Sequence, residues 1–224
     1  MQTNSVFLIN CPLFAGIKLG ELDNLISCLG GRKKKYPKDA YIFMADETPR
    51  NFGIVLSGSV LVVQDNFWGN RSILERIESN GLFGAAFALG GFEKLPVSVI
   101  AAEDSEVYLI DGSRITQTCQ SACTFHNRLI RNLMGNLAKR NALLIQKMEH
   151  ITQRTTREKL LSYLSSQALE HKSNSFEIPF DRQELADYLS LDRSAMSSEL
   201  GHMRDEGLLS FHKNQFTLNK RGME

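Results

Sequence analysis

The hydrophobic positions of the chain change their spacing along its length, and each spacing predicts a different kind of structure. Up to about residue 111, short apolar runs alternate with clusters of Gly, Asn, Asp and Pro. The runs are 40–44, 53–63, 71–77 and 97–110. Gly58 interrupts the second run, where we expect a turn or a close backbone approach. Many short strands with regular turns predict a small β barrel or jelly roll, and leucines at helical spacing over 13–29 predict a helix packed against it.

From residue 122 the spacing becomes that of one long helix. Two interleaved series recur every seven residues: Ile130, Leu137, Leu144 and Ile151, and then Met134, Asn141 and Met148. Such a two-position heptad repeat is typical of a helix that pairs with a copy of itself, so we expect a homodimer through these residues. A buried Asn such as Asn141 can fix the register of a two-stranded pair. The alternative is an amphipathic helix that packs only on its own barrel.

The stretch 181–209 is the most informative part of the chain and reads as two short helices around a tight turn. The first helix has one apolar face, formed by Leu185, Ala186 and Leu189. The second follows Asp192, a good N-cap residue, and its inner stripe is formed by Ala195, Met196, Leu200 and Met203. Gly207 ends this helix, and two short apolar runs, 208–211 and 215–218, predict a hairpin. Together these elements are the winged helix-turn-helix pattern.

The outer face of the second helix carries the candidate DNA-reading residues, which are Arg193, Ser194, Ser197 and Ser198. A recognition helix needs short polar and cationic side chains on its first turns, because these turns enter the major groove. Upstream, a helix over 152–167 is expected to bury Leu160, Leu161 and Leu164, and residues 171–176 are expected to form a polar loop. An ordinary helical hairpin that caps a domain is the alternative.

Composition adds limits to this picture. The chain has 224 residues, enough for two modest domains, and a formal net charge of +1, so any attraction to DNA must come from local charges. No basic leader followed by a long apolar run begins it, and no stretch approaches about 18 apolar residues, so we expect a soluble cytoplasmic protein without a membrane partner. The sparse cysteines, Cys11, Cys28, Cys119 and Cys123, fit reduced thiols better than a disulfide scaffold.

Three motifs, in this order, resemble the cyclic-AMP receptor protein/FNR family of bacterial transcription regulators. They are GIVLSGSVLVV, SNGLFG and DRQELADYLSLDRSAMSSELGHMRDEGLL. The resemblance covers nearly the whole chain and implies an α+β protein of three parts. These are an N-terminal β jelly-roll sensor domain of the cyclic-nucleotide-binding kind (1–121), a long dimerisation helix (122–151) and a winged helix-turn-helix DNA-binding domain (152–224). The implied partners are double-stranded DNA, a second copy of the chain and RNA polymerase.

The resemblance also implies roles for polar residues of the last domain. Arg193 matches a base-reading position of the family, and we expect it to meet the O6 and N7 atoms of a guanine. The three serines beside it would add shorter contacts. Relatives usually have a second Arg where Ser198 stands, so the operator should differ from theirs. The expected phosphate contacts, from the first helix and the wing, are Arg182, Gln183, His212 and Lys213.

The sensor domain departs from the cyclic-nucleotide binders of the family. Those proteins carry a Gly-Glu pair at the ribose and an Arg-Ser pair at the phosphate, whereas this chain has Gly84-Ala85 and Leu95-Pro96. A buried phosphodiester without a cation would lose its hydration uncompensated, so we expect no binding of cyclic AMP. The residues at the pocket of the relatives are Phe83, Gly84, Ala85, Ala86, Phe87, Leu95, Val97, Arg140, Leu143 and Leu144. They fit equally an unidentified apolar effector or no ligand at all, with the pocket filled by its own side chains.

Other sensing chemistries of the family lack a complete ligand set, so we expect no metal and no cofactor. An iron–sulfur cluster needs four converging thiolates, and only Cys11 and Cys28 lie near the N-terminus. Cys119 and Cys123 lie four apart, where two buried helix cysteines are a better interpretation than a redox or metal pair. A haem would want an axial His or Cys in the barrel, but the first His of the chain is His126, which leaves only haem held by other ligands as an alternative.

The sequence therefore predicts a homodimeric, sequence-specific DNA-binding transcription regulator. The resembling family consists mostly of activators, so we expect an activator. We also expect its DNA affinity to be controlled by a small-molecule effector other than cyclic AMP. One alternative is a cupin-like β-roll enzyme, which needs several His ligands inside the barrel, whereas the first 125 residues contain no His. The other is a ligand-binding module without a DNA-binding role. The polar outer face of the second helix favours DNA over a protein groove.

Overall fold

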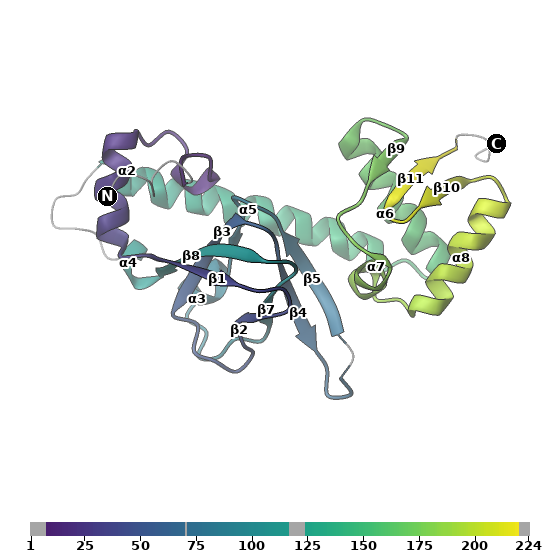
Figure 1. Ribbon diagram of the computed structural model, residues 1–224, viewed down its shortest axis with the longest axis horizontal. Helices are drawn as coiled ribbons and strands as arrows, with labels where there is room; N and C mark the ends of the chain where they lie inside the picture. Colours follow the sequence, from purple (N-terminus) through teal and green to yellow (C-terminus); the bar gives the residue numbers. More distant parts are fainter. Residues whose placement is uncertain (1–7, 70, 117–123, 220–224) are drawn as a thin grey trace. The chain divides into compact units, whose positions relative to one another are not determined.

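A computed structural model gives the fold and describes residues 8–69, 71–116 and 124–219 (Figure 1). The chain divides into two compact units, one within 1–70 and 74–141 and the other within 71–73 and 142–224. Strands dominate the first unit, and the second contains the helix-turn-helix and a small sheet. The mixed fold class that the sequence predicts is confirmed. Its division into three parts stays a prediction.

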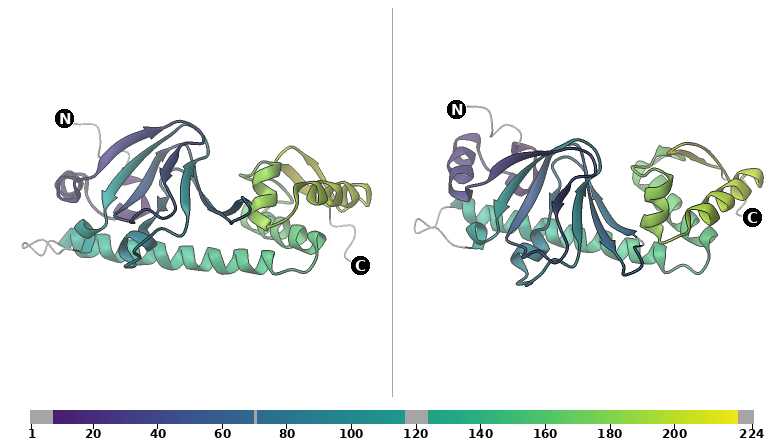
Figure 2. Two further views of the ribbon diagram at one scale, coloured as in Figure 1. Left: turned by 90° about the horizontal axis from the view of Figure 1, so that it is seen from below. Right: turned by 60° about the horizontal axis from the view of Figure 1, so that its bottom comes forward.

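Two four-stranded sheets form the roll of the first unit. One has the order β1 (Arg32–Tyr36), β8 (Ser105–Asp111), β3 (Asn51–Ser57) and β6 (Leu82–Phe83). The other has the order β2 (Tyr41–Phe43), β7 (Ser98–Ala101), β4 (Val60–Asp65) and β5 (Arg71–Ile77). Figure 2 shows these strands curling around an interior, with the first part of α5 (Thr124–Ile151) running alongside.

Strand alternation gives the first unit two apolar cores. On β8, Val107 and Leu109 join the core between the sheets, whereas Tyr108 and Ile110 join a second core on the other face. Successive side chains of a strand point to opposite faces, so β8 is buried on both sides. The second core is closed by helices: the 3-10 turn η1 (Pro12–Phe14), α2 (Leu19–Leu29), α4 (Ser113–Thr116) and α5.

The N-terminal helix is shorter than its leucine spacing predicts. The chain turns at Gly16, which has a φ of +73°, and α2 begins only at Leu19. Leu19 is 50% exposed, whereas Leu22, Leu25 and Leu29 are buried against α5 residues of the second core. The expected helix therefore packs on the roll through three of its leucines.

Gly58 forms the turn between β3 and β4, as the sequence predicts. Its φ is +76°, and a Cβ there would lie 2.4 Å from the Ser105 hydroxyl oxygen, so this position needs glycine for two reasons. In contrast, β1 was not predicted, because its sequence RKKKY lacks apolar alternation. Its backbone pairs with β8 from Arg32 to Tyr36, and only Tyr36 of the strand is buried.

The second unit contains α6 (Thr156–His171), α7 (Arg182–Leu189), α8 (Arg193–Asp205) and a three-stranded sheet. The order of this sheet is β10 (Leu209–His212), β11 (Gln215–Leu218) and β9 (Ser175–Glu177). In α6, Leu160 and Leu164 are buried, but Leu161 is 37% exposed, which corrects its expected inward position. Strand β9 pairs with β11 where the sequence predicts only a polar loop, because Phe176 supplies an apolar anchor.

Candidate functional site

Two local caps form the helix-turn-helix. Asp181 accepts a hydrogen bond from the Glu184 amide at 2.8 Å, and the Glu184 carboxylate accepts one from the Asp181 amide at 2.9 Å. Ser190, with a φ of 52°, ends α7, and Asp192 caps α8 by accepting from the Ala195 amide at 2.8 Å. These caps satisfy backbone donors that a helix start leaves open. Local sequence therefore fixes the turn between the two helices.

Helix α8 has the apolar inner side and the polar outer side that the sequence predicts. Met196, Leu200 and Met203 are buried, whereas Ala195, expected beside them, is exposed. The expected base-reading residues are all exposed: Arg193, Ser194, Ser197 and Ser198. Ser194 donates to Asp192, and this bond together with the Ala195 amide lowers the pKa of Asp192. The structure brings the four residues together at a capped helix start, as insertion into a major groove requires.

An ion-pair cluster that the sequence did not predict holds α8 against α6. Nε of Arg157 in α6 donates to Oε1 of Glu199 in α8 at 2.5 Å, and its Nη atoms donate to the Glu206 carboxylate at 2.9 and 2.6 Å. The hydrogen bonds from Arg157 lower the pKa of Glu206. Because Arg157 and Glu199 lie 42 positions apart, no local pattern could have revealed this contact.

Three of the four expected phosphate contacts are exposed. His212 and Lys213 lie at the turn of the wing between β10 and β11, where Lys213 has a φ of 54°. Gln183, in the first turn of α7, donates through Nε2 to Oδ1 of Asp187 at 2.9 Å. These side chains are accessible to a polyanion, and their contact with phosphate stays a prediction.

Arg182, the fourth, packs on the wing. Its Cζ lies 4.7 Å from the centre of the Phe211 ring and 5.0 Å from that of Phe216, which is a cation–π arrangement. Burial lowers the pKa of Arg182, and its Nη2 atom is buried without a hydrogen-bond partner. The guanidinium therefore ties α7 to the wing, which the sequence did not predict.

About half of the residues expected to line the effector pocket are buried in the core of the first unit. Phe83 is fully buried, its ring centre lies 5.4 Å from that of Phe43, and a Cβ on Gly53 would lie 2.0 Å from its ring. Buried with Phe83 are Gly84, Ala85, Leu95 and Val97. Phe87 is half-buried, and the exposed members of the set are Ala86, Leu143 and Leu144. The structure thus brings part of the set into the core and leaves three members at the surface.

Arg140, the one cation of the pocket set, is already engaged. Its Nη2 atom lies 2.5 Å from Oε2 of Glu75 on β5, and its Nη1 atom donates to the carbonyl of Leu82 on β6 at 2.9 Å. The two side chains are only 20% and 23% exposed, so solvent screens the pair weakly. A charge that could have served an anionic ligand is therefore neutralised within the first unit.

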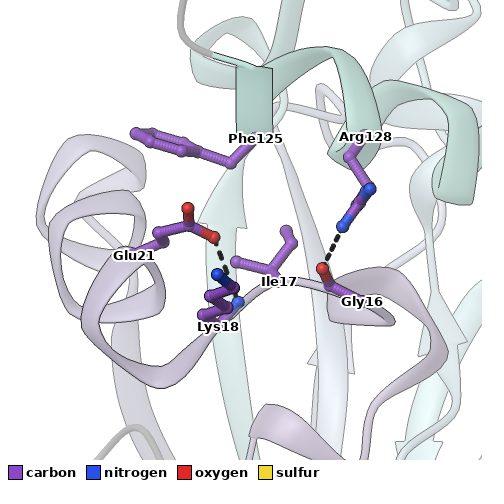
Figure 3. A pocket seen from close by; sticks show the side chains of 6 residues that line it. All are labelled: Gly16, Ile17, Lys18, Glu21, Phe125 and Arg128. Atoms are coloured by element: carbon purple, nitrogen blue, oxygen red, sulfur yellow. Dashed lines mark hydrogen bonds between the residues drawn. The ribbon is translucent and has the colours of Figure 1, made fainter.

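A cavity of about 180 Å³ lies near the starts of α2 and α5 (Figure 3). Its lining residues are Gly16, Ile17, Lys18, Glu21, Phe125 and Arg128. Arg128 donates to the carbonyl of Gly16, and the Lys18 amide donates to the Glu21 carboxylate at 3.2 Å. Two charged side chains of its wall, those of Arg128 and Glu21, are thus bonded to backbone atoms beside them. None of the lining residues belongs to the expected effector set.

The two heptad series of α5, which we call the dimer seam, lie on a partly exposed side of this helix. They are Ile130, Leu137, Leu144 and Ile151, and Met134, Asn141 and Met148. Met134 and Met148 are 66% and 59% exposed, and Asn141 and Leu144 are also exposed. Half-buried are Ile130, Leu137 and Ile151, of which the first two pack against the second core of the first unit. The helix therefore contacts its own roll and also presents an apolar stripe. Pairing with a second copy stays a prediction.

The cysteines of the described ranges do not form a cluster. The Cys11 thiol is buried and donates to the Asn80 carbonyl at 3.3 Å, and burial raises its pKa to about 11, whereas Cys28 is exposed. Cys119 and Cys123 lie outside the described residues. Within residues 8–69, 71–116 and 124–219, no group of three or more His, Cys, Asp and Glu side chains could hold a metal ion. No helix in these ranges is long and apolar enough to cross a membrane.

Comparison with known proteins assigns both domains. Residues 33–122 match the family model of the cyclic nucleotide-binding domain, and residues 158–223 match that of the Crp-like helix-turn-helix domain. No curated protein matches the chain.

Solved structures share the fold across nearly its whole length. The c-di-GMP responsive global regulator CLP of Xanthomonas campestris is 19% identical, with a TM-score of 0.72 over 88% of this chain and 98% of its own. FixK2 of Bradyrhizobium japonicum is 21% identical, with a TM-score of 0.64 over 85% and 93%. TTHB099, a transcriptional regulator of the CRP family from Thermus thermophilus, is 19% identical, with a TM-score of 0.61 over 83% and 91%.

Proposed function

This chain belongs to the CRP/FNR family of transcription regulators, and from that premise we propose that it is a homodimeric activator that binds a specific DNA sequence. The observation that carries the proposal is the outer face of α8, where Arg193, Ser194, Ser197 and Ser198 are exposed at a capped helix start. Arg193 would pair with the O6 and N7 atoms of a guanine, the commonest specific contact in the major groove. The serines would add shorter contacts beside it.

Phosphate contacts would hold α8 in register without adding sequence information. Exposed His212 and Lys213 in the wing and Gln183 on α7 support this role. Arg182 would assist by holding the wing against α7, and its remaining donors would face the backbone of the DNA. RNA polymerase would then be the protein partner of the DNA-bound dimer.

The exposed apolar stripe of α5 supports a dimer. Met134, Leu144 and Met148 would leave water when a second copy packs on the seam, and apolar burial is the main driving force of such pairing. Two copies of α8 related by a two-fold axis would read an inverted repeat whose half-sites lie one helical turn apart.

Two observations support indifference to cyclic AMP. The positions that would meet its ribose and phosphate are Ala85, Leu95 and Pro96, which carry no charge, and Arg140 is paired with Glu75. Control by a different small-molecule effector stays a prediction. The full burial of Phe83 favours the alternative in which the roll is filled by its own side chains.

The alternatives of another class are weaker. The match of residues 158–223 to the Crp-like helix-turn-helix domain, and the regulators that share the fold, support a transcription regulator over a cupin-like enzyme. A ligand-binding module without a DNA-binding role would not need four polar side chains exposed at the start of α8.

Selection of bound fragments from a genomic DNA library, followed by gel-shift titration at several salt concentrations, tests the proposed function. We expect enrichment of one inverted repeat, with an affinity about 10³-fold or more above that for unrelated DNA. Sedimentation of the same samples should give a dimer. Equal binding of all fragments would contradict the proposal, because the exposed face of α8 would then read no bases.

A further inference from the structure

A buried histidine joins the end of α5 to α6. His150 lies in the last turn of α5 and is only 4% exposed. Its Nδ1 atom is 2.7 Å from the Ser162 hydroxyl, and its Nε2 atom is 3.2 Å from the Ser166 hydroxyl. Ser162 and Ser166 lie one turn apart on α6, so both ring nitrogens bond to the same face of that helix.

The hydrogen bonds of Ser166 favour one tautomer of the ring. The Ser166 hydroxyl donates its hydrogen to the Tyr163 carbonyl at 2.8 Å, so towards His150 it can only accept. We therefore assign the proton to Nε2, which donates to Ser166. Nδ1 then accepts from the Ser162 hydroxyl. Neutral His150 thus satisfies both nitrogens with one donor and one acceptor.

A protonated His150 would be a buried cation without an anionic hydrogen-bond partner. Burial lowers the pKa of His150, and the carboxylate of Glu149 opposes this effect only in part. The C-terminus of α5 also favours a cation, but the result is still a lowered pKa, so desolvation dominates. Other charged groups act on the aromatic and helical neighbours of this corner, where the end of α5 meets α6: Lys147 on α5 lies over Tyr188, Glu170 on α6 acts on Tyr163, and Asp187 on α7 interacts with Arg71 on β5.

An aromatic cluster connects this corner to the helix-turn-helix. The Tyr163 ring stands edge-on to His150, with centres 5.9 Å apart, and lies 5.6 Å from the ring of Tyr188 on α7. Tyr188 stacks on Phe180 at 4.6 Å, and Nζ of Lys147 lies 4.0 Å above its ring. The last two turns of α5 therefore touch, directly and through α6, the helix that precedes α8.

From this geometry we propose that His150 makes DNA binding sensitive to pH. Neutral His150, held between Ser162 and Ser166, positions α6 and α7 on the end of α5, and protonation releases that corner. The inference rests on the proposed function, because the corner matters for DNA only if α8 reads it. It adds a positioning residue and a regulatory signal, the proton, to that function.

The direction of the effect follows from linkage. In an open corner His150 would titrate near its ordinary value of about 6.5, whereas in the closed corner its pKa is lower. The closed corner therefore has its full stability above about pH 6.5 and loses it as the pH falls below that value. DNA binding usually strengthens with acidification, because protonated histidines add cations near phosphate. A weakening is thus a distinctive result.

DNA affinity measured between about pH 7.5 and 5.5 tests the proposal on the full chain, with a fragment selected from genomic DNA. The wild type should lose roughly five- to tenfold in affinity, a typical coupling between sites. His150→Gln should remove this loss, because the Gln amide can donate to Ser166 and accept from Ser162 without titrating. His171→Gln, which changes an exposed histidine of α6, should keep the wild-type profile. An unchanged pH profile in His150→Gln would overturn the proposal.

A second measurement needs neither DNA nor a variant. NMR titration of the wild-type histidine rings should show His150 as the Nε2–H tautomer at neutral pH, with a pKa below the ordinary value. An Nδ1–H tautomer, or titration at or above about 6.5, would overturn the positioning role. If no DNA fragment is bound at any pH but the NMR result holds, the proposed function is wrong. The inference that neutral His150 joins the end of α5 to α6 would then still be supported.

Discussion

The expected DNA-reading face of α8, formed by Arg193, Ser194, Ser197 and Ser198, is exposed, whereas the interior of the roll is packed. On α8, Arg193 and its neighbouring serines are exposed, and the backbone beneath them is capped. In the roll, Phe83 is fully buried, and Arg140 is paired with Glu75. The first surface is accessible to a polyanion, whereas side chains of the second are engaged in packing and in an ion pair within the first unit. The difference supports the proposals that α8 reads DNA and that the roll does not bind a cyclic nucleotide.

The largest effect should come from separating the two copies of α8 while leaving each roll intact. Leu144→Asp would put a carboxylate into the apolar seam, where an unpaired charge is strongly disfavoured. We expect monomers in sedimentation and a fall of specific DNA affinity to the non-specific level, about 10³-fold or more. Ala142→Asp is the matched control, because Ala142 is also exposed but lies off the heptad series and outside the pocket set. A stable dimer of Leu144→Asp would contradict the assigned seam.

A smaller effect should follow from Gly53→Ala, which tests whether the roll is filled. The new methyl group would lie 2.0 Å from the Phe83 ring, so we expect a loss of about 1–3 kcal/mol in the free energy of unfolding measured with denaturant. Adding Phe83→Leu should recover part of this loss by making room. Gly135→Ala on α5 meets no atom within 4 Å and should instead stabilise by about 0.5–1 kcal/mol. If Gly53→Ala is neutral, the interior has free space and the filled-roll interpretation is wrong.

The reading face was predictable because its determinants are local. The Asp181 and Asp192 caps and the i, i+4, i+7 spacing of Met196, Leu200 and Met203 all lie within one short stretch. The turn at Gly58 was predictable for the same reason. Local rules also mislead, as at Ala195 and Leu161, which stand beside the buried stripes but are exposed.

What the sequence did not predict depends on contacts between distant segments. Strand β1 is four cations and a tyrosine, and only backbone pairing with β8 makes it a strand. Arg157 meets Glu199 and Glu206 across 42 and 49 positions, and Arg182 finds its place over the rings of Phe211 and Phe216. The sequence gives the residue types at the expected pocket positions. It does not predict which of them are buried, because burial depends on packing between strands that are distant in sequence.

Arg193→Ala should weaken specific binding by about 1–3 kcal/mol and relax one position of the operator, because a bidentate contact to guanine is lost. Selection on randomised DNA measures both effects. Ser197→Ala, on the same face, should have a smaller effect. An unchanged sequence preference of Arg193→Ala would mean that α8 does not read bases through its first turn. The exposure of this face could then no longer be explained by specific DNA binding.

Lys213→Ala should act on all DNA alike. Removal of one exposed cation from the wing should lower the affinity for specific and unrelated fragments by the same factor, and reduce the slope of log affinity against log salt by about one. Gel-shift titrations over a range of salt concentrations give this slope. A loss confined to the operator would contradict a phosphate contact and would make Lys213 part of the reading surface.

Cyclic AMP should have the smallest effect, which is none. Its phosphate would lie against Leu95 and Pro96 and its ribose against Ala85, so the ligand would lose hydration without gaining a cation or a carboxylate. Each 1.4 kcal/mol left uncompensated weakens binding about tenfold. Calorimetry with millimolar cyclic AMP should therefore give no saturable heat, and DNA affinity should not change.

Glu75→Gln sharpens this last test, because it removes the negative charge that neutralises Arg140, the one cation of the pocket set. The amide oxygen of this variant can still accept a hydrogen bond from Arg140 but carries no charge, so the guanidinium would keep its bond to the Leu82 carbonyl and an unneutralised positive charge. If this variant still ignores cyclic AMP, the buried Phe83 and the missing ribose partner are sufficient to exclude the nucleotide. If it acquires a saturable site while the wild type does not, the Arg140–Glu75 pair is what closes the roll to anions. A site in the wild type itself would contradict both the filled interior and the alignment of residues 84–97.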